Sequence, residues 1–412
     1  MIQFEKFKLQ NNLTVIVHQD KSTPMACVNI LYDVGARDED ENKTGFAHLF
    51  EHLMFGGSIN IPNYDEPLQL VGGENNAFTT NDITNYYCTV PAENLETAFW
   101  LESDRMLSLA FTDKSLEVQR SVVIEEFKQR YLNQPYGDVW LLLRPLAYKT
   151  HPYKWATIGK EISHIENATM ADVKSFFKKH YNPSNAIMVV AGNVELENVK
   201  QLAKKWFEPI AGGTKPKRNL PKEPKQTEAR KLTVERDVPV DSIYKAYHMV
   251  SRHDKNYYAC DLLSDVLSRG NSSRLYNSLV KDNPMFSEIN AYVMGDFDEG
   301  LFVVSGKLSS GVDIEAAEKA IIHELNKIKN SLVSENELQK CKNKVESSIT
   351  FSETDVLNKA TNLAISELMG DADYINQEIG KYLAVTANDI KDIAKKVLDE
   401  NNCSTLYYLK KK

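Results

Sequence analysis

A polar segment near the middle of the chain constrains the fold more than any other feature. Residues 212–231, GGTKPKRNLPKEPKQTEARK, are rich in proline and charge and poor in large apolar side chains. Such a segment cannot supply a hydrophobic core, which predicts an interdomain linker. The full length of 412 residues is too long for one ordinary core. We therefore predict two domains, residues 1–211 and residues 232–412, joined by this linker.

The two halves repeat the same order of expected elements. Each begins with two strands and a helix, continues with strands and two amphipathic helices, and ends with a capped helix and a strand. The last helix and strand are expected at 169–180 and 186–191, and again at 386–398 and 404–409. Runs of strands followed by runs of helices favour an α+β class. We predict two similar domains, each a largely antiparallel sheet packed with helices, that arose by internal duplication.

Composition and charge exclude several classes of function. The net charge of −8 argues against nucleic acid or an anionic membrane as the main partner. No window approaches the apolar length that spans a bilayer, and the amino terminus does not resemble a signal peptide. The five cysteines are scattered, without a CxxC pair, which is typical of reduced thiols. We expect a cytoplasmic protein.

The segment GFAHLFEHLMFGG, residues 45–57, carries the strongest chemical signal. On a helix, His48 and His52 leave the same face one turn apart, so both imidazoles can bind one Zn²⁺. Glu51 lies near that face and can take a proton from metal-bound water, whose pKa zinc lowers towards ~7. The alternative is a structural role, but burying three titratable groups among apolar residues costs several kcal/mol without a metal or partner. The order H-x-x-E-H is the inverted zinc-protease motif.

A third metal ligand is expected from the helix that contains SLEVQRSVVIEEFKQR, residues 115–130. Gln119, Val123 and Glu126 fall on one face of this helix, whereas Glu125 lies about 100° away. Glu126 is therefore the predicted ligand, and Glu125 is predicted to face solvent. A surface acidic pair is the alternative interpretation of these two glutamates.

Together these motifs resemble those of the pitrilysin and insulinase family of zinc peptidases. The resemblance rests on HLFEH at 48–52, GGENNAFTTNDITNYY at 72–87, ESDRM at 102–106, VVIEE at 122–126, HPY at 151–153 and SSRLYNSLV at 272–280. It covers nearly the whole chain, and half-size members similar to the catalytic subunit of the mitochondrial processing peptidase match best in length. The resemblance implies two similar α+β domains in each half-size chain.

The resemblance also implies roles for the matching residues. By this match, one Zn²⁺ per chain would be held by His48, His52 and Glu126, and Glu51 would be the general base. The family's edge strand adds an extended substrate peptide through backbone hydrogen bonds. That strand matches Asn76, Ala77, Phe78 and Thr79, for which the residues alone favour a strand end and turn.

Two positions depart from the family pattern. Gln119 stands where the family often has a glutamate below the third ligand, and we expect this loss of a charge behind the ligand to weaken metal binding without abolishing it. Active members also place an arginine and a tyrosine in the second domain to hold the substrate carbonyl and the oxyanion. Our alignment puts Val280 and Ser287 there. We favour a partner subunit as the source of both groups, and Tyr292 or Lys281 as the alternative.

The favoured function is a zinc-dependent metalloendopeptidase that cleaves peptides or unfolded segments as the zinc-carrying subunit of a dimer. A heterodimer is favoured over a homodimer, because the second subunit would supply the arginine and tyrosine. The alternative is a non-catalytic structural subunit of the same family, although such subunits typically lose zinc ligands that this chain keeps. A small-molecule hydrolase is disfavoured by the edge-strand segment. The cleavage specificity is left open.

Overall fold

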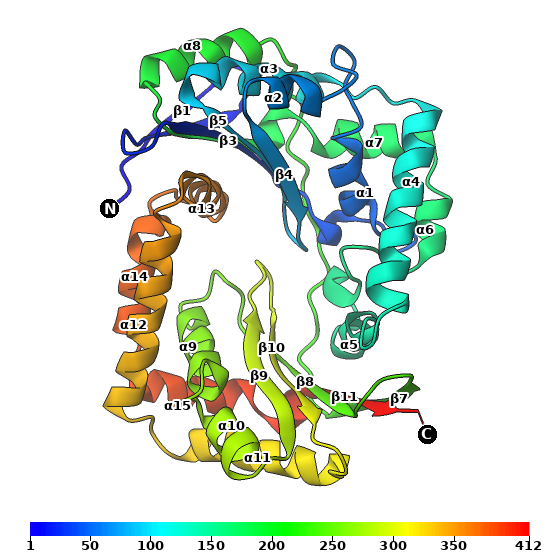
Figure 1. The fold of residues 1–412 in the computed structure, drawn as a ribbon, viewed down its shortest axis with the longest axis vertical. Coiled ribbons are helices and arrows are strands. Elements are labelled where there is room, and N and C mark those ends of the chain that lie inside the picture. The colour runs from blue at the N-terminus through cyan, green and yellow to red at the C-terminus, as the bar shows by residue number, and fades with distance from the viewer. Residues whose placement is uncertain (412) are drawn as a thin grey trace. The chain divides into compact units, whose positions relative to one another are not determined.

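The computed structural model describes residues 1–411, and the chain divides into two structural units (Figure 1). Unit 1 comprises Met1–Phe127, Trp155–Leu220 and Ile349–Gln377. Unit 2 comprises Lys128–Lys154, Pro221–Ser348 and Glu378–Lys412. Each unit therefore includes a segment from the other half of the chain. The domain boundaries at 211 and 232, and the internal duplication, stay predictions.

Unit 1 contains a six-stranded sheet in the order β1-β2-β6-β3-β5-β4. Its strands are β1 (Glu5–Lys8), β2 (Thr14–Gln19), β3 (Met25–Tyr32), β4 (Glu74–Thr79), β5 (Thr84–Pro91) and β6 (Ala186–Gly192). The β2–β6 pair is parallel and the other pairs are antiparallel. The central strands β3 and β6 are almost entirely buried, as expected for continuous apolar runs. Strand β4 lies at one edge.

The helices of unit 1 pack against its sheet or against one another. They are α1 (Phe46–Leu53), α2 (Asp65–Leu70), α3 (Leu95–Leu107), α4 (Asp113–Phe127), α6 (Ile162–Glu166), α7 (Met170–His180), α8 (Leu196–Trp206) and α13 (Val356–Leu368). Helix α13 comes from the second half of the chain and packs on β3 and β6. Its Lys359 forms an ion pair with Asp20, and its Thr361 Oγ1 donates to Asn29 Oδ1 at 3.2 Å. These interactions explain why α13 belongs to unit 1.

Unit 2 contains a five-stranded sheet in the order β7-β11-β8-β10-β9. The strands are β7 (Arg230–Arg236), β8 (Ser242–His248), β9 (Phe286–Met294), β10 (Leu301–Leu308) and β11 (Cys403–Lys410). Only β7 and β11 pair in parallel among these described strands. Its helices are α5 (Val139–Ala147), α9 (Tyr257–Ser268), α10 (Arg274–Tyr276), α11 (Ile314–Asn330) and α15 (Ala387–Val397), while α12 (Glu335–Ser352) and α14 (Tyr374–Ala384) flank α13 in the chain.

These two units confirm the predicted α+β class, with mostly antiparallel sheets packed by helices. The helices expected near 169–180 and 386–398 are also confirmed. Thr169 caps α7 and Thr386 caps α15, each in a capping box with an aspartate three residues later. Residues 212–229 form no helix or strand, and β7 begins at Arg230, inside the segment 212–231 that was predicted to be a linker. Of the helices in residues 1–411, none has the length and apolar character needed to cross a membrane.

Candidate metal centre

Helix α1 presents a polar face and buries an apolar one. Phe46, Leu49, Phe50 and Leu53 are buried, and the Phe50 ring stacks on Phe176 of α7 with 4.9 Å between centroids. The side chains of His48, Glu51 and His52 lie on the other side of the helix and are half-buried. The amphipathic spacing predicted from the sequence therefore holds these three groups at the surface of a rigid core.

Helix α4 packs against α1 and brings Glu126 to the two histidines. Glu126 Oε2 lies 3.5 Å from His48 Nε2 and 3.3 Å from His52 Nε2. The two imidazole rings are 4.9 Å apart at an interplanar angle of 87°. In a tetrahedral site with ligand bonds of about 2.0–2.1 Å, the ligand atoms are roughly 3.4 Å apart. The three side chains are thus spaced to fit one ion.

The donor set also fits zinc chemically. Two imidazole nitrogens and one carboxylate oxygen lie within 4.8 Å of one another. Three protein ligands of this kind leave one position for water or substrate, as in catalytic zinc sites. Within residues 1–411 this is the one group of three or more His, Cys, Asp or Glu residues close enough to hold a metal. All five cysteines are buried and free, which argues against a thiolate site.

Glu51 is connected to the edge strand β4. Its Oε2 accepts a hydrogen bond of 2.6 Å from Thr79 Oγ1, the last residue of β4. Tyr86 and Tyr181 lie nearby in the core, with their hydroxyl oxygens 3.3 Å apart. Burial raises the pKa of both tyrosines, and the negative charge of Glu51 raises it further. Both phenols therefore stay neutral at ordinary pH.

The four predicted substrate-binding residues all lie on β4. This strand pairs with β5 on one side, and no described strand pairs with its other side. The Ala77 amide donates to the side-chain Oδ1 of Asn76 at 2.8 Å. Phe78 and Thr79 are half-buried, and Asn76 is exposed. The segment is an edge strand, whereas its role with substrate stays a prediction.

The remaining predicted residues lie on α4 and in unit 2. Gln119 is on α4 with its Nε2 close to Gly56, just beyond the end of α1. Glu125 is exposed. Val280 lies in a π-helical segment, Asn277–Asp282, and Ser287 lies on β9, where its hydroxyl donates to the Lys307 carbonyl at 3.2 Å. Both Val280 and Ser287 belong to unit 2.

Helix α3 contains a buried ion pair, between Arg105 and Glu102, that the sequence did not indicate. Arg105 Nε donates to Glu102 Oε2 at 2.9 Å, and both residues are 1% exposed. The guanidinium lies 4.6 Å from the ring centroids of Tyr64 and Tyr86, and 5.3 Å from that of Phe55. Glu102 and Arg105 belong to the ESDRM segment, residues 102–106. The match of this segment to a family motif was the signal that the sequence offered. Sequence alone did not indicate that its arginine is enclosed by aromatic rings.

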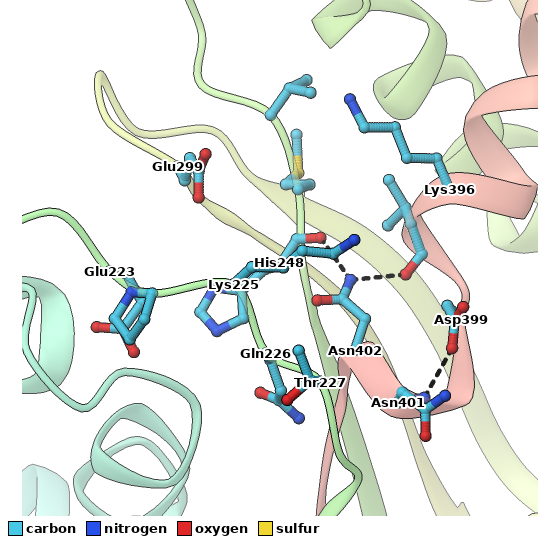
Figure 2. Close-up of a pocket in the computed structure, with 14 residues that line it drawn as sticks. Glu223, Lys225, Gln226, Thr227, His248, Glu299, Lys396, Asp399, Asn401 and Asn402 are labelled. Carbon is cyan, nitrogen blue, oxygen red and sulfur yellow. Dashed lines mark hydrogen bonds between the residues drawn. The ribbon is translucent and has the colours of Figure 1, made fainter.

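Unit 2 contains a cavity of about 560 Å³ (Figure 2). It is lined by Glu223–Thr227, His248–Val250, Glu299, Lys396, Val397, Asp399, Asn401 and Asn402. Several of its polar groups bond to the protein itself. Asn402 Nδ2 donates to the carbonyls of His248 and Val397, and Asp399 Oδ1 accepts from the Asn401 amide. Among the described residues, no metal-ligand cluster occurs at this cavity.

The fold and the inverted histidine motif define a class of metallopeptidase-like proteins, and comparison of the sequence with family models agrees. A model described as Insulinase (Peptidase family M16) matches residues 14–156, which include His48, His52 and Glu126. A second model, described as Peptidase M16 inactive domain, matches residues 167–345. The chain belongs to peptidase family M16, the pitrilysin and insulinase family, as its motifs predicted.

Individual relatives support this assignment. The chain is 32% identical to the zinc protease PqqE of Helicobacter pylori over 413 residues, covering 98% of this chain and 92% of that protein. A solved structure of a protease from Helicobacter pylori superposes with a TM-score of 0.92 at 30% identity, covering 99% of this chain and all of that one. The mitochondrial-processing peptidase subunit beta of Saccharomyces cerevisiae is 30% identical over 203 residues, which is 48% of this chain and 43% of that protein.

Proposed function

We propose that this protein is a zinc-dependent metalloendopeptidase that cleaves peptides or unfolded segments. The observation that carries the proposal is the cluster formed by His48, His52 and Glu126, with Glu51 beside it. The name of the relative from Helicobacter pylori, a zinc protease, supports the same conclusion. The intact cluster argues against the alternative of a non-catalytic structural subunit.

The proposed site consists of three metal ligands and a general base. His48, His52 and Glu126 would hold the ion, which when bound supplies a Lewis acid that lowers the pKa of water and polarises a carbonyl. Glu51 takes the proton of the attacking water and delivers it to the leaving amine. The 2.6 Å hydrogen bond from Thr79 orients the Glu51 carboxylate. Gln119 lies two helical turns from Glu126 and adds no charge to the site.

Strand β4 gives the site a way to hold an extended peptide. Its free edge can add a substrate strand through backbone hydrogen bonds, which accept many side-chain sequences. Because Thr79 on β4 also bonds to Glu51, a peptide along this edge would pass beside the general base. This placement favours an endopeptidase over a hydrolase of small molecules.

The oxyanion-holding groups are proposed to come from a second half-size subunit. Val280 and Ser287 stand at the positions where active members have an arginine and a tyrosine, and neither can stabilise an oxyanion strongly. A partner that carries both groups would complete the site, as a heterodimer or, with other residues substituting, a homodimer.

A cytoplasmic location stays a prediction from composition.

The decisive experiment compares wild-type protein with Glu51→Gln on a quenched peptide library. We expect one bound zinc per chain in both proteins and a loss of cleavage of about 100-fold or more in the variant, because the general base is removed. Glu125→Gln, an exposed neighbour of a ligand, serves as the matched control. Full cleavage by Glu51→Gln, alone or with candidate partners, would overturn the mechanism.

A further inference from the structure

Glu39 is a buried carboxyl group that the proposed mechanism does not use. It follows the 3₁₀ turn Ala36–Asp38 and is 9% exposed. Its Oε2 accepts a hydrogen bond from the Gly45 amide at 2.9 Å, and its Oε1 accepts one from the Ala47 amide at 2.8 Å. Both oxygens of this side chain are therefore engaged by the backbone at the beginning of α1.

These hydrogen bonds replace an ordinary helix cap. The first amides of a helix have no acceptor within the helix. The residue at the cap position of α1 is Gly45, which has no side chain to accept them. Glu39 supplies the missing acceptors from outside the helix, through its two side-chain oxygens.

The opposite side of the same turn is also held in place. Thr44 is fully buried, and its Oγ1 accepts from the Lys160 amide at 2.7 Å and contacts His164 Nδ1 at 2.8 Å. Gly45 adopts a φ of 87°, and a Cβ at this residue would lie 2.7 Å from the Ile158 carbonyl oxygen. The first turn of α1 is thus fixed between Glu39 and the segment at residues 158–164.

Burying a carboxyl group at this place costs folding free energy. Burial raises the pKa of Glu39 to about 8, and the neighbouring Asp38 raises it further, while the hydrogen bonds from Ala47, Gly45 and Trp155 lower it. An exposed Ser, Thr or Asp at the cap position would satisfy the helix without this burial. Perturbed groups of this kind concentrate at functional sites. A costly buried group of this kind indicates that the exact position of α1 is important for function.

We propose that Glu39 is a positioning residue for the metal centre, because it sets the first turn of α1 and so places His48 and His52 opposite Glu126. The inference rests on the proposed zinc function. Helix α1 has only eight residues, and His48 directly follows Ala47, whose amide Glu39 accepts. A shift of this turn therefore moves the ligand with it, and a misplaced ligand weakens metal binding.

The test measures zinc affinity by competition with a chromophoric chelator. For Glu39→Gln, which keeps the size of the side chain and loses one acceptor, we expect zinc to bind about 10-fold more weakly. The visible spectrum of the Co²⁺-loaded variant should also change, since it reports ligand geometry. Glu41→Gln is the matched control, because Glu41 is an exposed carboxylate in the same loop. Its zinc affinity and Co²⁺ spectrum should equal those of wild type.

Glu39→Asp provides a second variant, which keeps the carboxylate but shortens its reach. We expect it to be folded and to bind zinc with an affinity between those of wild type and Glu39→Gln. Zinc affinity in Glu39→Gln equal to that of Glu41→Gln would overturn the inference. Failure of both Glu39 variants to fold would also overturn it, because Glu39 would then serve the fold as a whole. A wild-type protein that binds no zinc would instead refute the proposed function.

Discussion

At the scale of residues, two adjacent glutamates on α4 have opposite surroundings. Glu126 faces both histidines of α1, and Glu125 is exposed. The step of about 100° per helical residue separates them, so neighbours in sequence point in different directions. This contrast allows the ligand assignment to be tested within one helix and with one kind of substitution.

We predict that Glu126→Gln lowers zinc affinity by about 10-fold or more, because an amide is a poorer ligand than a carboxylate. Glu125→Gln should leave zinc affinity within about twofold of wild type, since surface substitutions away from a site have small effects. Equilibrium titration of the metal-free proteins with zinc measures both. Equal affinities in the two variants would contradict the assignment of Glu126.

Glu39 should also give the metal-free protein a distinctive pH dependence. Its pKa is raised from 4.5 to about 8 by burial, so the folded state binds this proton more tightly than the unfolded state. The contribution of Glu39 to the free energy of unfolding is therefore greatest below pH 4.5 and falls as the pH rises to about 8. The side chain in Glu39→Gln cannot ionise, so the free energy of unfolding of this variant should not contain this decrease with pH.

Urea unfolding of the metal-free proteins at about pH 5 and about pH 9 measures this difference. Between these two conditions, wild type should lose more unfolding free energy than Glu39→Gln, by a few kcal/mol. Glu41→Gln should follow wild type, because Glu41 is exposed. If the free energies of unfolding of wild type and Glu39→Gln change equally with pH, the pKa of Glu39 is not raised by folding.

At the scale of elements, the edge strand β4 and helix α1 together form the proposed peptide site. The Ala77 amide donates to the Asn76 side chain at 2.8 Å. The Thr80 amide donates to the Ile83 carbonyl at the end of the β4–β5 hairpin, and because hydrogen-bonded and non-hydrogen-bonded pairs alternate, Ala77 opposite Tyr86 is at a non-hydrogen-bonded position. A proline at residue 77 therefore removes no ladder hydrogen bond, and prolines are tolerated on edge strands for this reason. The substitution removes only a donor that an added peptide strand could use.

We predict that Ala77→Pro lowers kcat/KM for peptide cleavage by about 10-fold, which corresponds to one lost hydrogen bond of roughly 1.4 kcal/mol. Zinc affinity should stay at the wild-type value, since β4 supplies no ligand. Ala77→Val, which keeps the amide and favours a strand, is the control. If the Ala77→Pro and Ala77→Val variants cleave peptides equally well, the proposal that the substrate adds to strand β4 at this residue is wrong.

At the scale of the whole molecule, the proposed metal ligands and the expected oxyanion-stabilising positions belong to different units. The cluster on α1 and α4 lies in unit 1, whereas Val280 and Ser287 lie in unit 2 and lack the required chemistry. Tyr292, the alternative donor on β9, is half-buried, and burial raises its pKa to about 12. It stays a neutral hydroxyl at ordinary pH.

We predict that this chain alone cleaves peptides slowly. Addition of a half-size family member that has an arginine and a tyrosine at the positions of Val280 and Ser287 should raise the rate by about 100-fold, as expected for restored oxyanion donors. Cleavage assays with and without such a partner test this, with its arginine replaced by alanine as the control. No gain in rate on mixing would refute the heterodimer proposal.

The sequence by itself determined those features that neighbouring residues encode. The spacing of His48, Glu51 and His52 determined one helical face, and the capping residues of α7 and α15 determined where those helices begin. The same periodicity separated Glu126 from Glu125. Each of these signals is local, because it depends on backbone geometry repeated along a few residues.

Only the tertiary structure decided which distant residues meet. It placed α13 from the second half of the chain on β3 and β6, bonded Thr79 to Glu51, and brought Glu39 to the first turn of α1. Helical and strand periodicity indicate which face is buried, but not which element covers it. That choice depends on shape and on hydrogen-bond partners that the fold supplies, because a buried polar group is stable only where its partner lies within reach.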